Sequence, residues 1–209
     1  YNLGLCSSHK KHREDAFQYF NKALEVIDPD KSGIELETEI KFQLGKLHFE
    51  NNDNFQAFEI LNELAGGEET TQTQTQIKRM LGVVLCRLKQ YKKAALLLQQ
   101  SLSANKYDAV AMSYLGIVYL RQKQGEEIAR SLCEQGCELL PDDIQLKLHL
   151  GIAEMACGNY DIAYPILKRC LLYNKTREAA AEEMAVYYLK INNKKRAEYW
   201  KRKSLQYVQ

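Results

Sequence analysis

No hydrophobic run in the sequence is long enough to cross a membrane. A membrane-spanning helix needs about 18 or more consecutive apolar residues, and no stretch of these 209 residues approaches that length. A leader with a charged start followed by an apolar segment is also missing from the N-terminus. We therefore expect no transmembrane segment in this chain.

Motifs typical of catalysis are absent as well. The sequence contains no metalloprotease helix, no Gly-rich loop of the kind that holds phosphate, and no Ser or Cys in a recognisable nucleophile context. Four histidines are scattered along the chain, and we expect each on the surface or in a groove: His9, His12, His48 and His149. These absences predict a protein that is not an enzyme and that binds no metal or cofactor.

Neither sign of charge dominates, since the chain has 29 Lys and Arg against 27 Asp and Glu. A charge so close to balance gives no general reason to expect a polyanionic partner. The distribution is uneven, because residues 1–70 hold 7 basic against 14 acidic side chains and the remainder holds 22 against 13. Two basic clusters, "HKKHR" at 9–13 and "KKRAEYWKRK" at 194–203, leave nucleic-acid binding as an alternative function.

Small residues recur at nearly constant spacing within apolar, helix-like segments. The segment "SYLGIVYLRQ" (113–122) carries Gly116 near its centre, although glycine in a helix costs about 1 kcal/mol relative to alanine. Equivalent positions follow at intervals of 41, 37, 34, 35 and 34 residues and are occupied by Gly4, Gly45, Gly82, Gly116, Gly151 and Ala185. A small residue retained in each repeat predicts that another element approaches closely there.

A second series of small residues runs in step with the first. An alanine follows each small residue by twelve positions, except that Ala129 comes one residue late; the others are Ala16, Ala57, Ala94, Ala163 and Ala197. Apolar residues four and eight positions after most of these alanines complete a helical face. Each unit is therefore predicted to be two amphipathic helices joined by a short polar turn. Capping-box spacing places the starts of the second and third units at Ser32 and Thr73.

With these features the sequence resembles the tetratricopeptide repeat family. The resemblance rests on the Leu-Gly pair, on Tyr119 three residues after Gly116, on the alanine that opens each second helix, and on Pro141 at the end of a second helix. It implies an all-α fold, a single right-handed superhelical array over residues 1–209. About six helix-turn-helix units are expected, at approximately 1–33, 34–70, 71–106, 107–142, 143–176 and 177–209. Because Tyr1 already falls inside a first helix, we expect the first unit to be truncated at its N-terminus.

The first helices of this family line a concave groove, which implies the candidate site. The corresponding positions in this sequence are mostly apolar and are edged by arginine: Phe42, Lys46, Phe49, Arg79, Val83, Arg87, Ile117, Arg121, Leu148, Ile152, Met155 and Val186. The subgroup that grips acidic C-terminal tails of two heat-shock chaperones uses Asn and Lys at such positions. This sequence departs from that pattern, because Lys46 stands alone. An alternative is that part of the row packs against the next first helix or against an N-terminal segment absent from this fragment.

These residues predict a non-enzymatic protein-interaction module, a scaffold or chaperone-like adaptor. An apolar groove edged by arginine suits a peptide or an amphipathic helix with apolar anchors and some acidic residues. Nucleic-acid binding through the basic clusters remains the alternative.

Cysteines fall where other units place core residues, at Cys6, Cys133, Cys137 and Cys170. Free cysteine behaves as a small hydrophobic residue in such positions. We expect reduced, structural thiols, which suit a reducing compartment, and therefore a cytoplasmic protein.

Overall fold

The computed structural model describes all residues except 10–12, 28–30, 67–70 and 208–209, and the side chains of 6–9 and 31 are likewise outside the description. The described residues form helices and no strand. The helices are α1 (Asn2–His9), α2 (Arg13–Glu25), α3 (Lys31–Glu50), α4 (Asn54–Leu64), α5 (Gln72–Arg87), α6 (Tyr91–Ala104), α7 (Ala109–Gln122), α8 (Glu126–Leu139), α9 (Ile144–Ala156), α10 (Tyr160–Cys170), α11 (Asn174–Lys190) and α12 (Lys194–Tyr207). None of these described helices is both long enough and apolar enough to span a membrane.

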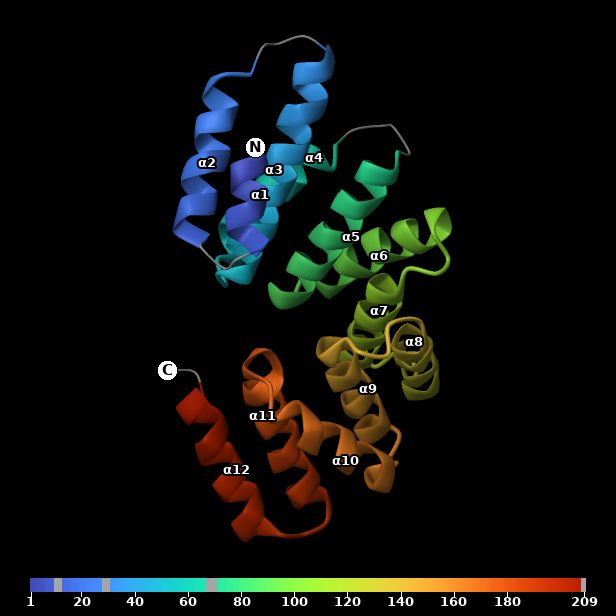
Figure 1. Cartoon of the computed structure of the whole chain (residues 1–209). Coiled ribbons are helices and arrows are strands. Elements are labelled where there is room, and N and C mark those ends of the chain that lie inside the picture. The colour runs from blue at the N-terminus through green and yellow to red at the C-terminus, as the bar shows by residue number, and fades with distance from the viewer. Residues whose placement is uncertain (10–12, 28–30, 67–70, 208–209) are drawn as a thin grey trace. The chain divides into compact units, whose positions relative to one another are not determined.

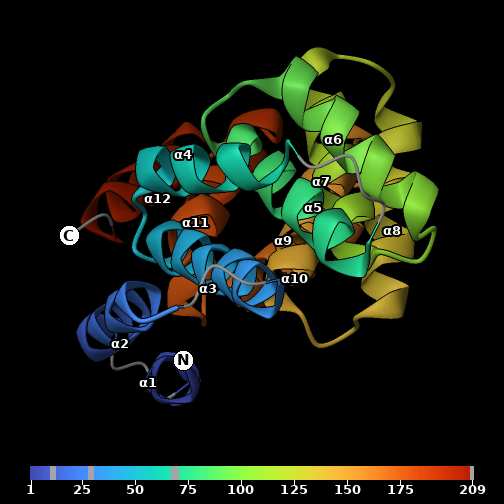
Figure 2. The same ribbon diagram turned by 90° about the horizontal axis from the view of Figure 1, so that it is seen from above.

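The chain forms two compact parts, an N-terminal subdomain (Tyr1–Ala104) and a C-terminal subdomain (Asn105–Gln209). Consecutive helices pair as hairpins in each subdomain, and the two helices of every pair contact one another (Figure 1). In the N-terminal subdomain α1 lies beside α2, and α3 packs against both α2 and α4 (Figure 2). In the C-terminal subdomain α9 contacts α7, α8, α10 and α11. Within each subdomain, a first helix that follows another hairpin therefore packs against its own partner and against that preceding hairpin, whereas a single array across both subdomains stays a prediction.

The hairpins close around their small residues. A Cβ atom added to Gly116 would lie 2.7 Å from the backbone oxygen of Ala129 and 2.7 Å from Cys133 Sγ. The close approach that the sequence predicted is therefore confirmed, and at Gly116 the partner is the predicted alanine. At Gly82 a Cβ would instead lie 2.9 Å from Cγ of Leu98, one turn beyond the alanine. The large residue four positions after the alanine thus fills the space that glycine leaves.

The turns within five of the hairpins share one backbone geometry although their sequences differ. Each contains a residue in the left-handed region: Asn52, Lys89, Lys123, Gly158 and Asn192. Such a residue lets the last carbonyl groups of a helix accept hydrogen bonds before the chain reverses. Lys123 shows this directly, because its N–H donates to the backbone oxygen of Leu120.

Helix starts are fixed by short polar side chains. Asp53, Thr71, Asp108 and Asp143 each accept a hydrogen bond from a backbone N–H in the first turn of the following helix. Such caps satisfy N–H groups that have no partner inside the helix. Thr71, not Thr73, caps α5, and α3 begins at Lys31, so both predicted helix starts were wrong by one or two residues.

Cysteines contribute to the core of the C-terminal subdomain. Cys133 and Cys170 are fully buried and Cys137 is partly buried, in line with their predicted core register, whereas the side chain of Cys6 lies outside the description. Burial raises the pKa of the Cys133 thiol to about 12 and that of Cys170 to about 11. Both groups are therefore protonated at neutral pH, and neither is an activated nucleophile.

The raised pKa of Cys133 predicts a loss of stability at alkaline pH. An unfolded cysteine titrates near pH 8.5, so the folded state binds this proton more tightly than the unfolded state does. The stabilisation is complete below about pH 8.5 and is lost as the pH rises towards 12. We expect the free energy of unfolding of wild type to fall more steeply above pH 9 than that of Cys133→Ala, with a difference in slope of up to about 1.4 kcal/mol per pH unit. Denaturant titrations from pH 7 to 10.5 measure this, and parallel profiles would contradict it.

Candidate functional site

In the N-terminal subdomain, the candidate groove residues lie on the first helices α3 and α5. Phe42 and Val83 are buried, so they belong to the core and offer little surface to a partner. Lys46, Phe49 and Arg79 are partly exposed. The Lys46 ammonium lies 5.7 Å from the centre of the Phe42 ring and donates a hydrogen bond to Gln43 Oε1 at 3.1 Å.

Arg87 forms the best-defined contact of this face. Its guanidinium carbon lies 3.8 Å from the centre of the Phe49 ring, within cation–π range. The same group donates hydrogen bonds to the backbone oxygen of Phe49 at 3.4 Å and to Asn52 Oδ1 at 3.2 Å. Arg87 is exposed, so the pair presents a guanidinium held over an aromatic ring. A guanidinium binds a carboxylate or a carbonyl group through the N–H groups at its edge, and stacking on the ring leaves that edge open to such a partner.

In the C-terminal subdomain, half of the candidate residues are inside the core. Ile117, Leu148 and Met155 are buried at 7%, 2% and 5% exposure, because α9 packs directly against both α7 and α11. Their burial agrees with the alternative from the sequence, in which part of the row of candidate residues packs inside the protein and does not face a partner. Ile152 is partly exposed, and Arg121 and Val186 are exposed.

Exposed apolar surface on α11 continues beyond the predicted site. Val186 is 40% exposed and Leu189, three residues later on the same side of the helix, is 57% exposed. The sequence analysis missed Leu189, although Leu189 follows Ala185 by four residues. Phe49 follows Gly45, and Met155 follows Gly151, at the same distance. We name the surface formed by Ile152, Val186 and Leu189 the α9–α11 face.

Charged groups border the α9–α11 face. Burial raises the pKa of the Glu183 carboxyl, and the positive charge of Arg121 partly opposes this rise. The Arg121 guanidinium on α7 is therefore near enough to act on a carboxyl of α11. Lys190 is exposed at the end of the same helix. The face thus combines apolar side chains with both signs of charge.

His149 takes part in a buried polar cluster rather than standing on the surface or in a groove. Its Nδ1 lies 2.8 Å from Ser113 Oγ, its Nε2 lies 3.0 Å from Gln145 Nε2, and its ring packs edge-on against Tyr114 at 4.6 Å. The expectation for His149 was therefore wrong, because a hydrogen bond between α7 and α9 compensates for burying the imidazole. Ser113 is fully buried, so this Ser-His pair is closed to any substrate.

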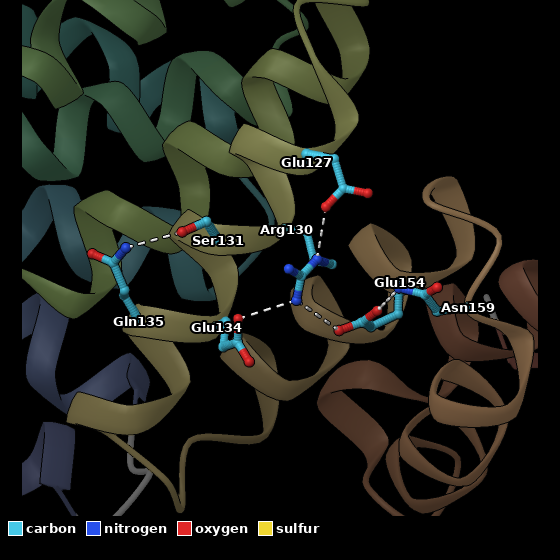
Figure 3. Close-up of polar contacts among 7 residues, drawn as sticks. All are labelled: Glu127, Arg130, Ser131, Glu134, Gln135, Glu154 and Asn159. Carbon is cyan, nitrogen blue, oxygen red and sulfur yellow. Dashed lines mark hydrogen bonds and ion pairs between the residues drawn. The ribbon is translucent and has the colours of Figure 1, made fainter.

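A second polar cluster ties α8 to α9 through Arg130 (Figure 3). The guanidinium donates to Glu127 Oε2 and Glu134 Oε2, each at 3.1 Å, and lies 3.8 Å from Glu154 Oε1. Glu154 is buried and also accepts a hydrogen bond from Asn159 Nδ2 at 2.6 Å. The carboxylates are thus occupied by the arginine and the amide. Over the described ranges, no group of three or more His, Cys, Asp or Glu side chains is placed to hold a metal ion.

The basic cluster near the C-terminus forms α12. Lys194, Lys195 and Lys201 are exposed, and Tyr199 beside them is 53% exposed. Trp200 packs against the core of the C-terminal subdomain. Tyr199 is therefore available to a ligand, whereas Trp200 stabilises the fold. Most of the first cluster, "HKKHR", lies outside the described residues.

A pocket of about 640 Å³ opens among α1, α2 and α3. Its lining includes exposed Leu3 and Val26, together with Tyr19, Leu36 and the charged Lys22. Sequence reasoning missed this pocket because its residues come from three helices whose packing the repeat pattern does not specify. Its apolar lining makes it a second surface suited to apolar side chains.

Comparisons with known proteins identify the fold. No family model matches the sequence, and no curated protein matches it. Among solved structures, a tetratricopeptide repeat protein from Parabacteroides merdae ATCC 43184 has a TM-score of 0.64 at 16% identity, covering 98% of this chain and 77% of that one. A structure of MamA has a TM-score of 0.57 at 22% identity, covering 81% and 92%. A structure of MamA, residues 41 to the end, from Desulfovibrio magneticus RS-1 has a TM-score of 0.56 at 16% identity, covering 82% and 94%.

These likenesses place the chain in the class of all-α helical-repeat proteins. Its hairpins have the tetratricopeptide repeat fold, which confirms the fold class predicted from the sequence. At such identities the likeness concerns the fold, so function must be argued from the surfaces of this chain itself.

Proposed function

We propose that the chain is a non-enzymatic protein-interaction module that holds a segment of a partner protein against its first helices. The observation that carries the proposal is the α9–α11 face, where Val186 and Leu189, one turn apart on α11, expose 40% and 57% of their surface and Ile152 on the adjacent helix α9 is partly exposed. Exposed apolar side chains that adjoin one another, rather than standing singly, are typical of interaction sites. Arg121 and Lys190 at the border favour acidic residues in the partner segment.

The size of the α9–α11 face suits a short segment with moderate affinity. Burying one aliphatic side chain contributes about 1.5–3 kcal/mol, and three such contacts must also offset the cost of ordering the ligand. The balance favours binding in the micromolar range, near about −8 kcal/mol, once charge contacts are added. An amphipathic helix or an extended peptide with apolar anchors meets these requirements.

The candidate residues of the N-terminal subdomain extend the proposal as a separate contact surface. Lys46, Phe49, Arg79 and Arg87 retain exposed surface, and Arg87 is already ordered by Phe49 and Asn52. A preordered guanidinium loses little freedom on binding a carboxylate. We also infer a cytoplasmic location, because buried thiols used as core residues suit a reducing compartment.

The proposal is tested by replacing the exposed residues and leaving the core intact. A Val186→Glu, Leu189→Glu double variant should keep its circular dichroism and lose a partner that wild type recovers from native lysate. An Ile162→Glu, Leu172→Glu variant is the matched control, since both residues are more than half exposed but lie outside the α9–α11 face. Equal recovery by all three proteins, or equal loss in both variants, would refute the assignment of the face.

Nucleic-acid binding is the second candidate, favoured by the exposed lysines and Tyr199 on α12. Basic side chains interleaved with aromatic ones can hold phosphates and stack on bases. Lys194→Ala, Lys195→Ala and Lys201→Ala together should then abolish an RNA or DNA affinity that falls steeply with salt. Absence of measurable binding at about 50 mM salt would eliminate this candidate.

A further inference from the structure

A second pocket in the C-terminal subdomain has the composition of a small-ligand site. It measures about 460 Å³ and lies where α8, α9 and α10 meet. Leu150, Pro165 and Ile166 supply an apolar wall, and Cys137, Lys147 and Arg169 supply polar groups. Ligand pockets in proteins typically measure about 300–1,000 Å³ and combine apolar walls with a few polar groups.

The two cations of this pocket form no ion pair with a described residue. Lys147 comes from α9 and Arg169 from α10, and neither side chain forms an ion pair or a hydrogen bond with a described residue. Asp143 is the nearby carboxylate at the start of α9, and its Oδ1 already accepts hydrogen bonds from the N–H groups of Gln145 and Leu146. Two cations from different helices thus border one apolar cavity without an ion-pair partner among the described residues.

The Lys147 ammonium is close to the interior of the pocket. Burial raises the pKa of the Cys137 thiol to about 11, and the positive charge of Lys147 opposes that rise. The same ammonium acts in the same sense on Cys170, a buried residue at the end of α10. Lys147 is itself partly buried, so its charge is less screened by solvent than a fully exposed lysine would be.

We propose that this pocket binds a carboxylate carried on a short apolar chain. Lys147 and Arg169 hold the carboxylate, and Leu150, Pro165 and Ile166 contact the apolar part. Charge-assisted hydrogen bonds to a guanidinium give both strength and direction to such an interaction. A phosphate ion would leave the apolar wall unused, and an uncharged chain would leave both cations without a partner. The chemistry fits two sources, a free fatty acid or the C-terminal end of a peptide with apolar last residues.

The site is separate from the proposed partner-binding face. None of its lining residues belongs to the α9–α11 face, and Arg169 and Pro165 lie on a second helix of a hairpin, whereas the partner is expected on first helices. The inference therefore does not depend on the proposed function, and each can fail without the other.

Calorimetric titration of the whole chain with octanoate, octanol and inorganic phosphate tests the inference. A peptide ending in Ile-Val-Leu is titrated both with a free C-terminal carboxylate and as its amide. We expect binding of octanoate, of the free-acid peptide, or of both, at least about tenfold tighter than octanol, phosphate and the amidated peptide. The stronger of the two binders identifies the source. Binding by neither, or equal binding of octanol or of phosphate, would overturn the proposal.

Matched variants locate the binding. Lys147→Gln with Arg169→Gln should weaken the affinity at least about tenfold. Lys168→Gln with Lys175→Gln removes the same charge from exposed positions outside the pocket and should leave the affinity unchanged. Protection of Cys137 from methyl methanethiosulfonate, measured by peptide mass spectrometry, gives an independent readout. Equal weakening in both variants, or no protection of Cys137 at saturation, would contradict the site.

Discussion

Replacing Gly116 with alanine should lower the free energy of unfolding by about 2 kcal/mol. The added methyl group would lie 2.7 Å from the backbone oxygen of Ala129, and backbone cannot move aside without separating α7 from α8. Such overpacking costs about 3 kcal/mol, and the better helix propensity of alanine returns about 1 kcal/mol. The thermal midpoint should fall by roughly 4–8 °C for a chain of this length.

Two other glycines serve as controls for Gly116→Ala. A Cβ at Gly66 would meet only the backbone oxygen of Glu63 at 3.6 Å, an ordinary contact, so Gly66→Ala should be nearly neutral. At Gly82 the obstacle is the side chain of Leu98, which can adjust more easily than backbone, so the cost should be intermediate. Equal thermal midpoints for Gly116→Ala and Gly66→Ala would contradict the close helix contact.

Ile117→Glu should unfold the C-terminal subdomain. Ile117 is 7% exposed, so the substitution removes about 2 kcal/mol of apolar burial. It also buries a carboxylate without a partner, which costs several kcal/mol more. The total approaches the 5–15 kcal/mol that stabilises a typical domain. Hydrogen exchange read by mass spectrometry should show rapid exchange in α7 to α12, whereas residues 1–104 stay protected.

Val186, an exposed residue in the same repeat register, gives the comparison for Ile117→Glu. Val186→Glu likewise replaces a β-branched aliphatic side chain with a carboxylate, at a 40% exposed position, and should alter stability by no more than about 0.5 kcal/mol. A well-folded Ile117→Glu protein would show that Ile117 is accessible and belongs to a groove. The pair thus separates core residues from partner-binding residues, which the repeat register alone does not do.

Much of the fold was predictable because its determinants are local and periodic. A small residue and an alanine recur in each repeat twelve residues apart, or thirteen for Gly116 and Ala129, and the contact between Gly116 and Ala129 follows from bringing two amphipathic helices together. The start of α5 was less predictable, because Thr71 and Thr73 both suit a helix cap and only the contacts of the folded chain select Thr71.

The candidate site was predictable only in part. Repeat register assigns a residue to one side of a first helix, but exposure depends on how closely the next first helix packs. Ile117 and Ile152 share a register, yet Ile117 is buried and Ile152 is partly exposed. Contacts between distant residues, such as His149 with Ser113 or Lys147 with the pocket of α8 to α10, leave no periodic signal in the sequence.

Site-specific photo-crosslinking tests the central claim most directly. A photoreactive amino acid is placed at Val186 in one protein and at Ile162 in another, and each is irradiated in native lysate. We predict a discrete crosslinked protein at Val186 that excess wild type competes away and the Val186→Glu, Leu189→Glu variant does not. Mass spectrometry should map the crosslink to a segment with apolar and acidic residues. The same products at Ile162, or products consisting mainly of nucleic acid, would contradict binding at the α9–α11 face.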